Sequence, residues 1–181
     1  MYQVGDKVVY PHHGAGTVVK REVREVLGEK REYLTIQILH NDMTVQVPAD
    51  NAEKVGLRTV IDEEQVTLVL KYLTNGGTEM PKNWNRRFKH NRDKMKTGDI
   101  FELAEVVRNL SLRDRDKGLS TGEKQMFVKA KKILASELMY AKGMDEDECS
   151  EWLEGVLTDA DDLPGTKKTV KKAKPAAKAT V

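Results

Sequence analysis

The sequence has little of several features on which large classes of proteins depend. A single cysteine, Cys149, in 181 residues excludes a disulfide framework within the chain, which fits a reducing compartment. No apolar run approaches the roughly 18 residues of a membrane span, and the first residues lack a basic stretch followed by an apolar one. We therefore expect a soluble, cytoplasmic protein.

Motifs for catalysis or metal binding are also missing from the sequence. Neither G-x-S-x-G nor G-x-x-x-x-G-K-[ST] occurs, and no two histidines have the i, i+4 spacing of a helical metal pair. His12 and His13 lie in a turn with proline and glycine, and Cys149 lies on an apolar helical face beside Trp152. The carboxylates are scattered among lysines, as on a solvated surface. We expect neither an enzyme nor a metal or cofactor site.

The charge is small in total and uneven in distribution. The formal net charge is +2, and residues 1–60 hold eight basic and eight acidic side chains. Residues 82–96, by contrast, hold seven Lys or Arg against a single acidic residue, Asp93, and Trp84 lies within this run. Clustered basic side chains neutralise backbone phosphates, and an exposed ring among them can stack on a base or wedge between base steps. The segment predicts nucleic-acid binding.

The residues around Trp84 also allow a second interpretation. Trp84, Phe88 and Met95 can share one buried helical stripe, with the charges solvated on the opposite face. Asn83 is a good N-cap, however, which places Trp84 in the first turn, where a side chain can project past the helix end. Four basic side chains crowd that turn: Arg86, Arg87, Lys89 and Arg92. Such crowding is costly unless anions share the site, so the residues alone leave a core and a surface role open.

The first 58 residues have the pattern of a small antiparallel barrel. Short apolar runs with alternating polar residues are separated by turn residues, which is typical of strands. The predicted strands are 7–10, 17–26, 32–39, 43–48 and a short last strand near 54–58.

From residue 62 the apolar period becomes helical, and it predicts five helices over residues 62–158. Three of them start at capping patterns, formed by Asp62 with Gln65, Ser120 with Glu123, and Asp145 with Glu148. A flexible connector is expected over 75–78, directly before the basic helix. Residues 159–181 are rich in Lys, Ala, Thr and Pro with almost nothing to bury, so we expect a disordered tail.

Four stretches of the chain carry a resemblance to one family: VGDKVVYPHHGAGTV, MTVQVPADNAEKVGLR, NWNRRFK, and AEVVRNL with RDRDKGLSTGEKQM. Together they resemble the CarD/CdnL family of bacterial transcription regulators over residues 2–157, in order and without large gaps. The resemblance implies a Tudor-like barrel over 1–58 that binds the β subunit of RNA polymerase. It also implies a helical domain over 62–158 that holds promoter DNA at the upstream edge of the transcription bubble and stabilises the open complex.

The resemblance further implies which residues make these contacts. The minor-groove wedge of the family matches Trp84, and its DNA-contacting basic residues match Arg86, Lys89 and Lys124. On the barrel, Arg24 matches a polymerase-contacting position, and Gln46 stands where relatives carry Arg. The expected protein is a monomer that binds polymerase and weakly sequence-dependent promoter DNA. An adaptor that uses the helices for a second protein is the alternative; a repair-coupling motor is excluded because no P-loop occurs.

Overall fold

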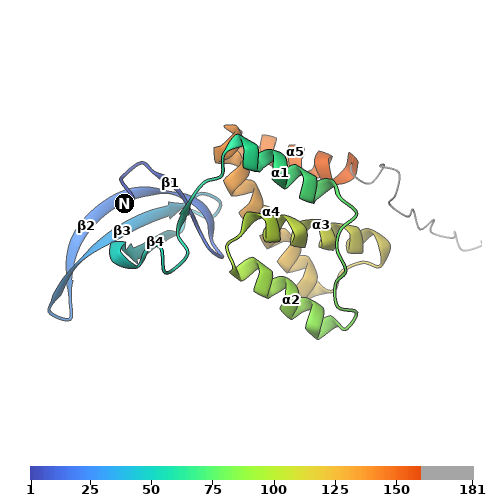
Figure 1. The fold of residues 1–181 in the computed structure, drawn as a ribbon, viewed down its shortest axis with the longest axis horizontal. Coiled ribbons are helices and arrows are strands. Elements are labelled where there is room, and N and C mark those ends of the chain that lie inside the picture. The colour runs from blue at the N-terminus through green and yellow to red at the C-terminus, as the bar shows by residue number, and fades with distance from the viewer. Residues whose placement is uncertain (160–181) are drawn as a thin grey trace, which may run out of the picture.

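The computed structural model describes residues 1–159, so the predicted tail lies outside the described residues except for Asp159. Five strands come first in the chain and five α-helices follow (Figure 1). This arrangement confirms the expected α+β class. No helix within residues 1–159 combines the length and the apolar character needed to span a membrane.

The strands form one antiparallel sheet in the order β4-β3-β2-β1-β5. They are β1 (Lys7–Tyr10), β2 (Gly14–Val26), β3 (Glu29–Ile38), β4 (Thr44–Pro48) and β5 (Arg58–Thr59), with a 3-10 turn, η1 (Ala49–Asn51), after β4. Alternating side chains of β1, β2 and β3 bury a cluster around Val8, Val18, Leu34 and Ile36. The last strand starts at Arg58, later than the predicted 54–58, because residues 52–56 form turns instead.

The hairpin of β2 and β3 extends away from the helices (Figure 1). A shift of register between Val18 and Lys20 interrupts its ladder, as in a β-bulge, which bends a strand and increases its twist. Beyond this point the strand residues are mostly exposed, and Leu27 at the tip is fully exposed. The sheet therefore presents one long arm to solvent.

The helices are α1 (Glu63–Thr74), α2 (Trp84–Lys96), α3 (Ile100–Asp116), α4 (Thr121–Lys142) and α5 (Glu146–Asp159). The predicted caps are confirmed: Asp62 and Ser120 form reciprocal capping boxes with Gln65 and Glu123. Asp145 and Glu148 exchange the same two hydrogen bonds, at 2.8 and 3.2 Å. Each of these bonds satisfies a backbone N–H at the start of a helix, where no intrahelical partner exists.

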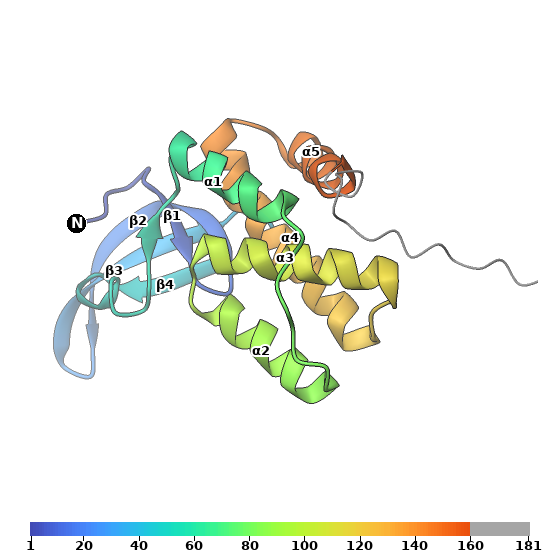
Figure 2. The same cartoon turned by 45° about the vertical axis from the view of Figure 1, so that its right-hand side comes forward.

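In the helical part α3 lies between α1 and α2 (Figure 2). Its buried residues join those of α1, α4 and α5 in a second apolar core, separate from that of the sheet. Cys149 of α5 is fully buried there, with its Sγ 3.5 Å from the carbonyl oxygen of Ala135, and burial raises the pKa of the thiol. The interpretation of Cys149 as a core residue is confirmed.

The connector before α2 is held by hydrogen bonds, in contrast to the expected flexible segment. The backbone N–H of Thr78 donates to Asn109 Oδ1 at 2.8 Å, and Arg108 Nε donates to the Asn75 carbonyl at 2.6 Å. Gly77 has a φ of 76° and lies so close to Asn109 and Leu112 that an added Cβ would clash with both side chains. Gly77 thus allows the connector to pack closely on α3.

The sheet and the helices meet along α4, next to β2. Arg58 of β5 binds Glu137 of α4 with two hydrogen bonds of 2.6 and 2.8 Å, and the N–H of Ile61 donates to the same carboxylate. Ser136, one residue earlier, accepts a hydrogen bond of 2.9 Å from the N–H of Ala15. Glu137 is only 2% exposed, so the expectation that the carboxylates are all solvated is wrong here.

Candidate nucleic-acid interface

The first turn of α2 presents Trp84 at the surface. Asn83 caps the helix by accepting a hydrogen bond of 3.1 Å from the N–H of Arg86, as predicted. Trp84 is 44% exposed, whereas Phe88 and Met95 on the same stripe pack against the helical core. The predicted stripe therefore divides: its later members belong to the core, and its first member is half in solvent.

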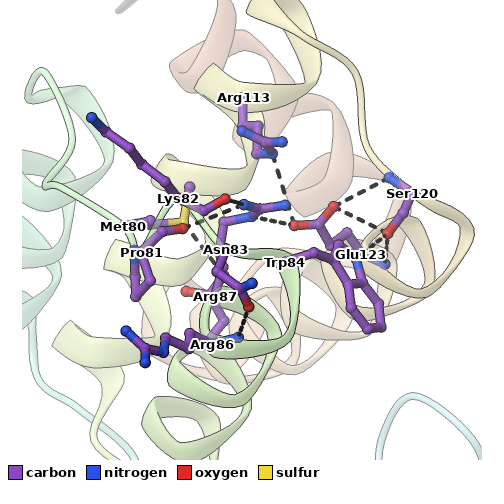
Figure 3. Close-up of polar contacts among 11 residues, drawn as sticks. Met80, Pro81, Lys82, Asn83, Trp84, Arg86, Arg87, Arg113, Ser120 and Glu123 are labelled. Carbon is purple, nitrogen blue, oxygen red and sulfur yellow. Dashed lines mark hydrogen bonds and ion pairs between the residues drawn. The ribbon is translucent and has the colours of Figure 1, made fainter.

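The half-exposed indole is held in one orientation from two sides. Its ring stacks on Phe88 with the centroids 5.3 Å apart and an interplanar angle of 21°. Its Nε1 donates a hydrogen bond of 2.9 Å to Ser120 Oγ, the cap of α4 (Figure 3). Gly122 faces both rings, and a Cβ at that position would lie 3.4 Å from Phe88 and 3.7 Å from Trp84. The free face of the ring is thus pre-positioned by α2 and α4 together.

Arg87 lies behind Trp84 as a buried residue. It is 3% exposed, and its Nε donates a hydrogen bond of 2.6 Å to Glu123, which is itself 1% exposed. Its Nη1 donates to the carbonyl oxygens of Pro81 and Lys82 (Figure 3). The interpretation that this arginine crowds the basic turn and needs an external anion is wrong, because its anion is a carboxylate of the same chain.

Glu123 connects this buried pair to the tryptophan. One carboxylate oxygen binds Arg87, and the other accepts hydrogen bonds from the N–H and the hydroxyl of Ser120, at 3.2 and 3.0 Å. Burial would raise the pKa of the carboxyl, but the hydrogen bonds from Arg87 and Ser120 outweigh burial and lower it. Glu123 is therefore ionised at neutral pH. The S-x-x-E pattern indicated the cap, but no sequence pattern indicated the hydrogen bond between Ser120 and the indole.

The other predicted DNA contacts are exposed basic residues near this turn. Arg86 and Lys89 lie on the solvent side of α2, and Lys124 lies in the first turn of α4, one residue after Glu123. Since Ser120 and Glu123 join the starts of the two helices, the structure brings Lys124 to the same end of the molecule as Trp84. A flat ring among long cations is an arrangement that can contact phosphates and a base step together.

On the sheet, the two predicted polymerase contacts lie next to each other. Arg24 of β2 and Gln46 of β4 are both exposed, and Arg24 Nη1 donates a hydrogen bond of 3.0 Å to Gln46 Oε1 across β3. Arg24 also forms an ion pair with Glu22. Within residues 1–159 β4 pairs with β3 on one side and forms an edge of the sheet, where its outer backbone groups can pair with another strand.

Metal ligands are not assembled anywhere in the part of the chain that the structure describes. No group of three or more His, Cys, Asp or Glu side chains within residues 1–159 has a geometry that could hold a metal ion. Burial lowers the pKa of both His12 and His13, and the charge of Lys129 lowers it further.

Comparison with known protein families assigns both halves of the chain. Residues 2–61 match the CarD-like/TRCF RID domain, and residues 68–154 match the CarD C-terminal domain. The chain belongs to the CarD family. The resemblance expected from the sequence is thereby confirmed, and the two matched segments correspond to the sheet and to the helices.

Two known proteins show similarity to this chain. The CarD-family protein named "Putative transcription factor YdeB", from Bacillus subtilis (strain 168), is 38% identical over 146 residues, which covers 81% of this chain and 95% of that protein. The solution NMR structure of the 72-residue N-terminal domain of Myxococcus xanthus CarD is 34% identical, with a TM-score of 0.29, over 33% of this chain and 79% of that chain.

Proposed function

We propose that this CarD-family chain is a bacterial transcription regulator that stabilises the promoter open complex. Residues 1–58 bind the β subunit of RNA polymerase, and residues 62–158 hold promoter DNA at the upstream edge of the bubble. Trp84 enters the minor groove there, while Arg86, Lys89 and Lys124 contact phosphates. The family assignment supports the association with transcription.

The observation that carries the DNA side of this proposal is the geometry of Trp84. The exposed apolar surface of a large aromatic ring is unfavourable in water, and binding to a partner that covers it is favourable. The ring of Trp84 is already oriented for such a partner by Ser120 and Phe88. An inserted ring offsets the few kcal/mol needed to unstack a base step only where the duplex is already distorted. Binding that prefers melted over closed DNA shifts the equilibrium toward the open complex.

The polymerase side is supported by the edge strand β4 and the exposed pair Arg24 and Gln46. An edge strand can receive a strand of a partner protein, with main-chain hydrogen bonds providing affinity. A few phosphate contacts, such as those proposed for Arg86, Lys89 and Lys124, alone give weak binding, with dissociation constants on the order of 10⁻⁴ to 10⁻⁶ M. Attachment to polymerase beside the DNA raises the effective concentration to the order of millimolar, which fills such a site.

The test is Trp84→Ala in the full chain, with Trp84→Phe as the matched control that retains a flat ring. The lost hydrogen bond and ring stacking should cost roughly 1–2 kcal/mol of unfolding free energy, well below the ~3–5 kcal/mol for a fully buried ring. Base stacking contributes ~1–3 kcal/mol, so the lifetime of the open complex should fall between several-fold and about a hundredfold. Trp84→Phe should retain part of the stabilisation.

Two results would contradict the proposal. A folded Trp84→Ala protein that prolongs open complexes as well as the parent does would remove the wedge from the mechanism. A parent protein that binds polymerase but no DNA in the complex would instead favour the adaptor function.

A further inference from the structure

A second basic surface lies on α4, beyond the turn that carries Trp84. An open groove there is lined by two turns of α4 and by the turn between β3 and β4: Lys124, Gln125, Val128, Lys129, Lys132, His40 and Asn41. We refer to it as the lysine groove. Lys124 is its first member and is also a proposed DNA contact, so the groove begins where the Trp84 site ends.

The lysines of the groove form a row along the helix. Residues at i, i+4 and i+8 lie on one face, so Lys124, Val128 and Lys132 are stacked one above the other, with Lys129 beside them. The row from Lys124 to Lys132 is about 12 Å long at 1.5 Å per residue. That length of duplex axis carries about seven phosphates, counting both strands.

The charges in the groove are unbalanced. Among residues 1–159, Lys124, Lys129 and Lys132 form no ion pair, whereas Lys131, on the neighbouring face, is paired with Glu154. Like charges one turn apart repel each other, and this repulsion is relieved when an anion lies along the row.

Two turns of the sheet reach the same positive region. Burial lowers the pKa of His12, and the charges of Lys129 and Lys96 lower it further. Burial and the charge of Lys132 likewise lower the pKa of His40, although Glu146 of α5 acts in the opposite direction. Lys96 at the end of α2 and Lys129 in α4 therefore lie close enough to the His12 turn, and Lys132 in α4 close enough to the His40 turn, to act on these histidines.

We propose that duplex DNA continues from Trp84 along α4, with backbone phosphates bound by Lys129 and Lys132 and with the turns of His12 and His40 at the far end. This inference rests on the proposed DNA-binding function and extends it to the sheet. A duplex fits because the groove is open, the lysines follow one another at helical spacing, and the row starts at the Trp84 site. Val128, which is 50% exposed, can lie against sugar carbons between the phosphates.

The experiment measures DNA affinity of the full chain against salt concentration for the parent and for Lys129→Ala/Lys132→Ala. Each lost phosphate contact should flatten the log-log slope by about 0.9, or about 1.8 for both. Between 50 and 200 mM salt the parent should therefore lose about 12-fold more affinity than the variant. Lys54→Ala/Lys71→Ala is the control, because it removes the same charge from exposed positions outside the groove, and its slope should equal that of the parent.

A length series gives an independent measurement. The probes are duplexes with a fixed unpaired region, lengthened step by step on either side. The affinity of the parent should rise on one side as the duplex reaches Lys129 and Lys132, and this rise should be smaller in the double variant.

Thermal melting of every variant identifies any loss of fold; if the alanine protein is destabilised, Lys129→Gln/Lys132→Gln makes the same test. An unchanged slope in a folded double variant overturns the inference. The inference is also overturned if the double variant binds polymerase more weakly while its salt slope for DNA stays unchanged. That result would mean that the lysine groove binds an acidic protein surface. If Arg86→Ala and Lys124→Ala flatten the slope and the double variant does not, this inference fails alone. If the parent shows no DNA binding, the proposed function fails with it.

Discussion

Each end of α4 holds a buried carboxylate, and the arginine that binds this carboxylate is buried to a different degree at the two ends. Each end buries a glutamate, Glu123 or Glu137, about four helical turns apart, and each glutamate binds an arginine from another element. At the first end the arginine, Arg87, is 3% exposed; at the second end Arg58 is 31% exposed. Desolvation is therefore nearly complete in one pair and partial in the other.

The difference shows that a buried ion pair can have two kinds of role. The pair of Glu123 is connected to a cap and an indole, so it fixes side chains within the helical part. The pair of Glu137 joins β5 to α4, so it fixes the sheet relative to the helices. If residues 1–58 bind polymerase and α2 binds DNA, the pair of Glu123 determines the shape of the DNA-binding surface. The pair of Glu137 then determines how that surface is oriented relative to the polymerase-binding sheet.

The largest effect is expected from removing Arg87. Arg87→Met leaves Glu123 as a buried charge without its main partner, which should cost ~3–5 kcal/mol of unfolding free energy. Denaturant unfolding measures this cost, and Arg86→Met, at an exposed neighbouring position, should change stability by less than about 0.5 kcal/mol. Equal effects of the two substitutions would show that the buried pair contributes nothing special.

A smaller effect is expected at the second pair. Arg58→Met should cost about 1–3 kcal/mol, because water reaches part of the guanidinium and can solvate the remaining carboxylate. The N–H of Ala15, which donates to Ser136, should then exchange with solvent faster than amides in either core. Faster exchange throughout both cores, with Ala15 no different, would mean that Arg58 supports the fold in general and not the junction.

The smallest effect on stability is expected from Ser120, and it separates the cap from the indole bond. Ser120→Ala should cost ~0.5–2 kcal/mol through the lost cap and should shift the NMR resonance of the Trp84 Nε1–H. Ser120→Thr retains a hydroxyl, so it should keep both the helix cap and the hydrogen bond from the indole. An Ala variant in which the indole resonance does not move would show that the stacking on Phe88 alone orients the ring.

Local signals in the sequence predicted much of this structure. The caps at Asp62, Asn83 and Ser120 form as expected, because a cap is decided by residues three or four positions apart. The surface position of Trp84 follows from the cap that precedes it. The sequence resemblance, and not the periodicity, indicated Lys124 as a neighbour of the Trp84 site.

Partners far apart in the chain could not be predicted in the same way. Arg87 and Glu123 are 36 residues apart, and Arg58 and Glu137 are 79 apart. A charged residue in an amphipathic pattern normally faces solvent, and only the packing of α2 and β5 against α4 brings the opposite charges together. For the same reason the bond from the indole to Ser120 became visible only in three dimensions.

The reactivity of Cys149 can be used to measure how often α5 separates from α4. It is the sole thiol in the sequence, it is fully buried between α5 and α4, and burial raises its pKa, so little thiolate exists in the closed state. A thiol reagent can modify it only when α5 separates from Ala135. The rate of modification therefore reports the frequency of these separations in the unaltered protein, and it can be measured with or without DNA and polymerase.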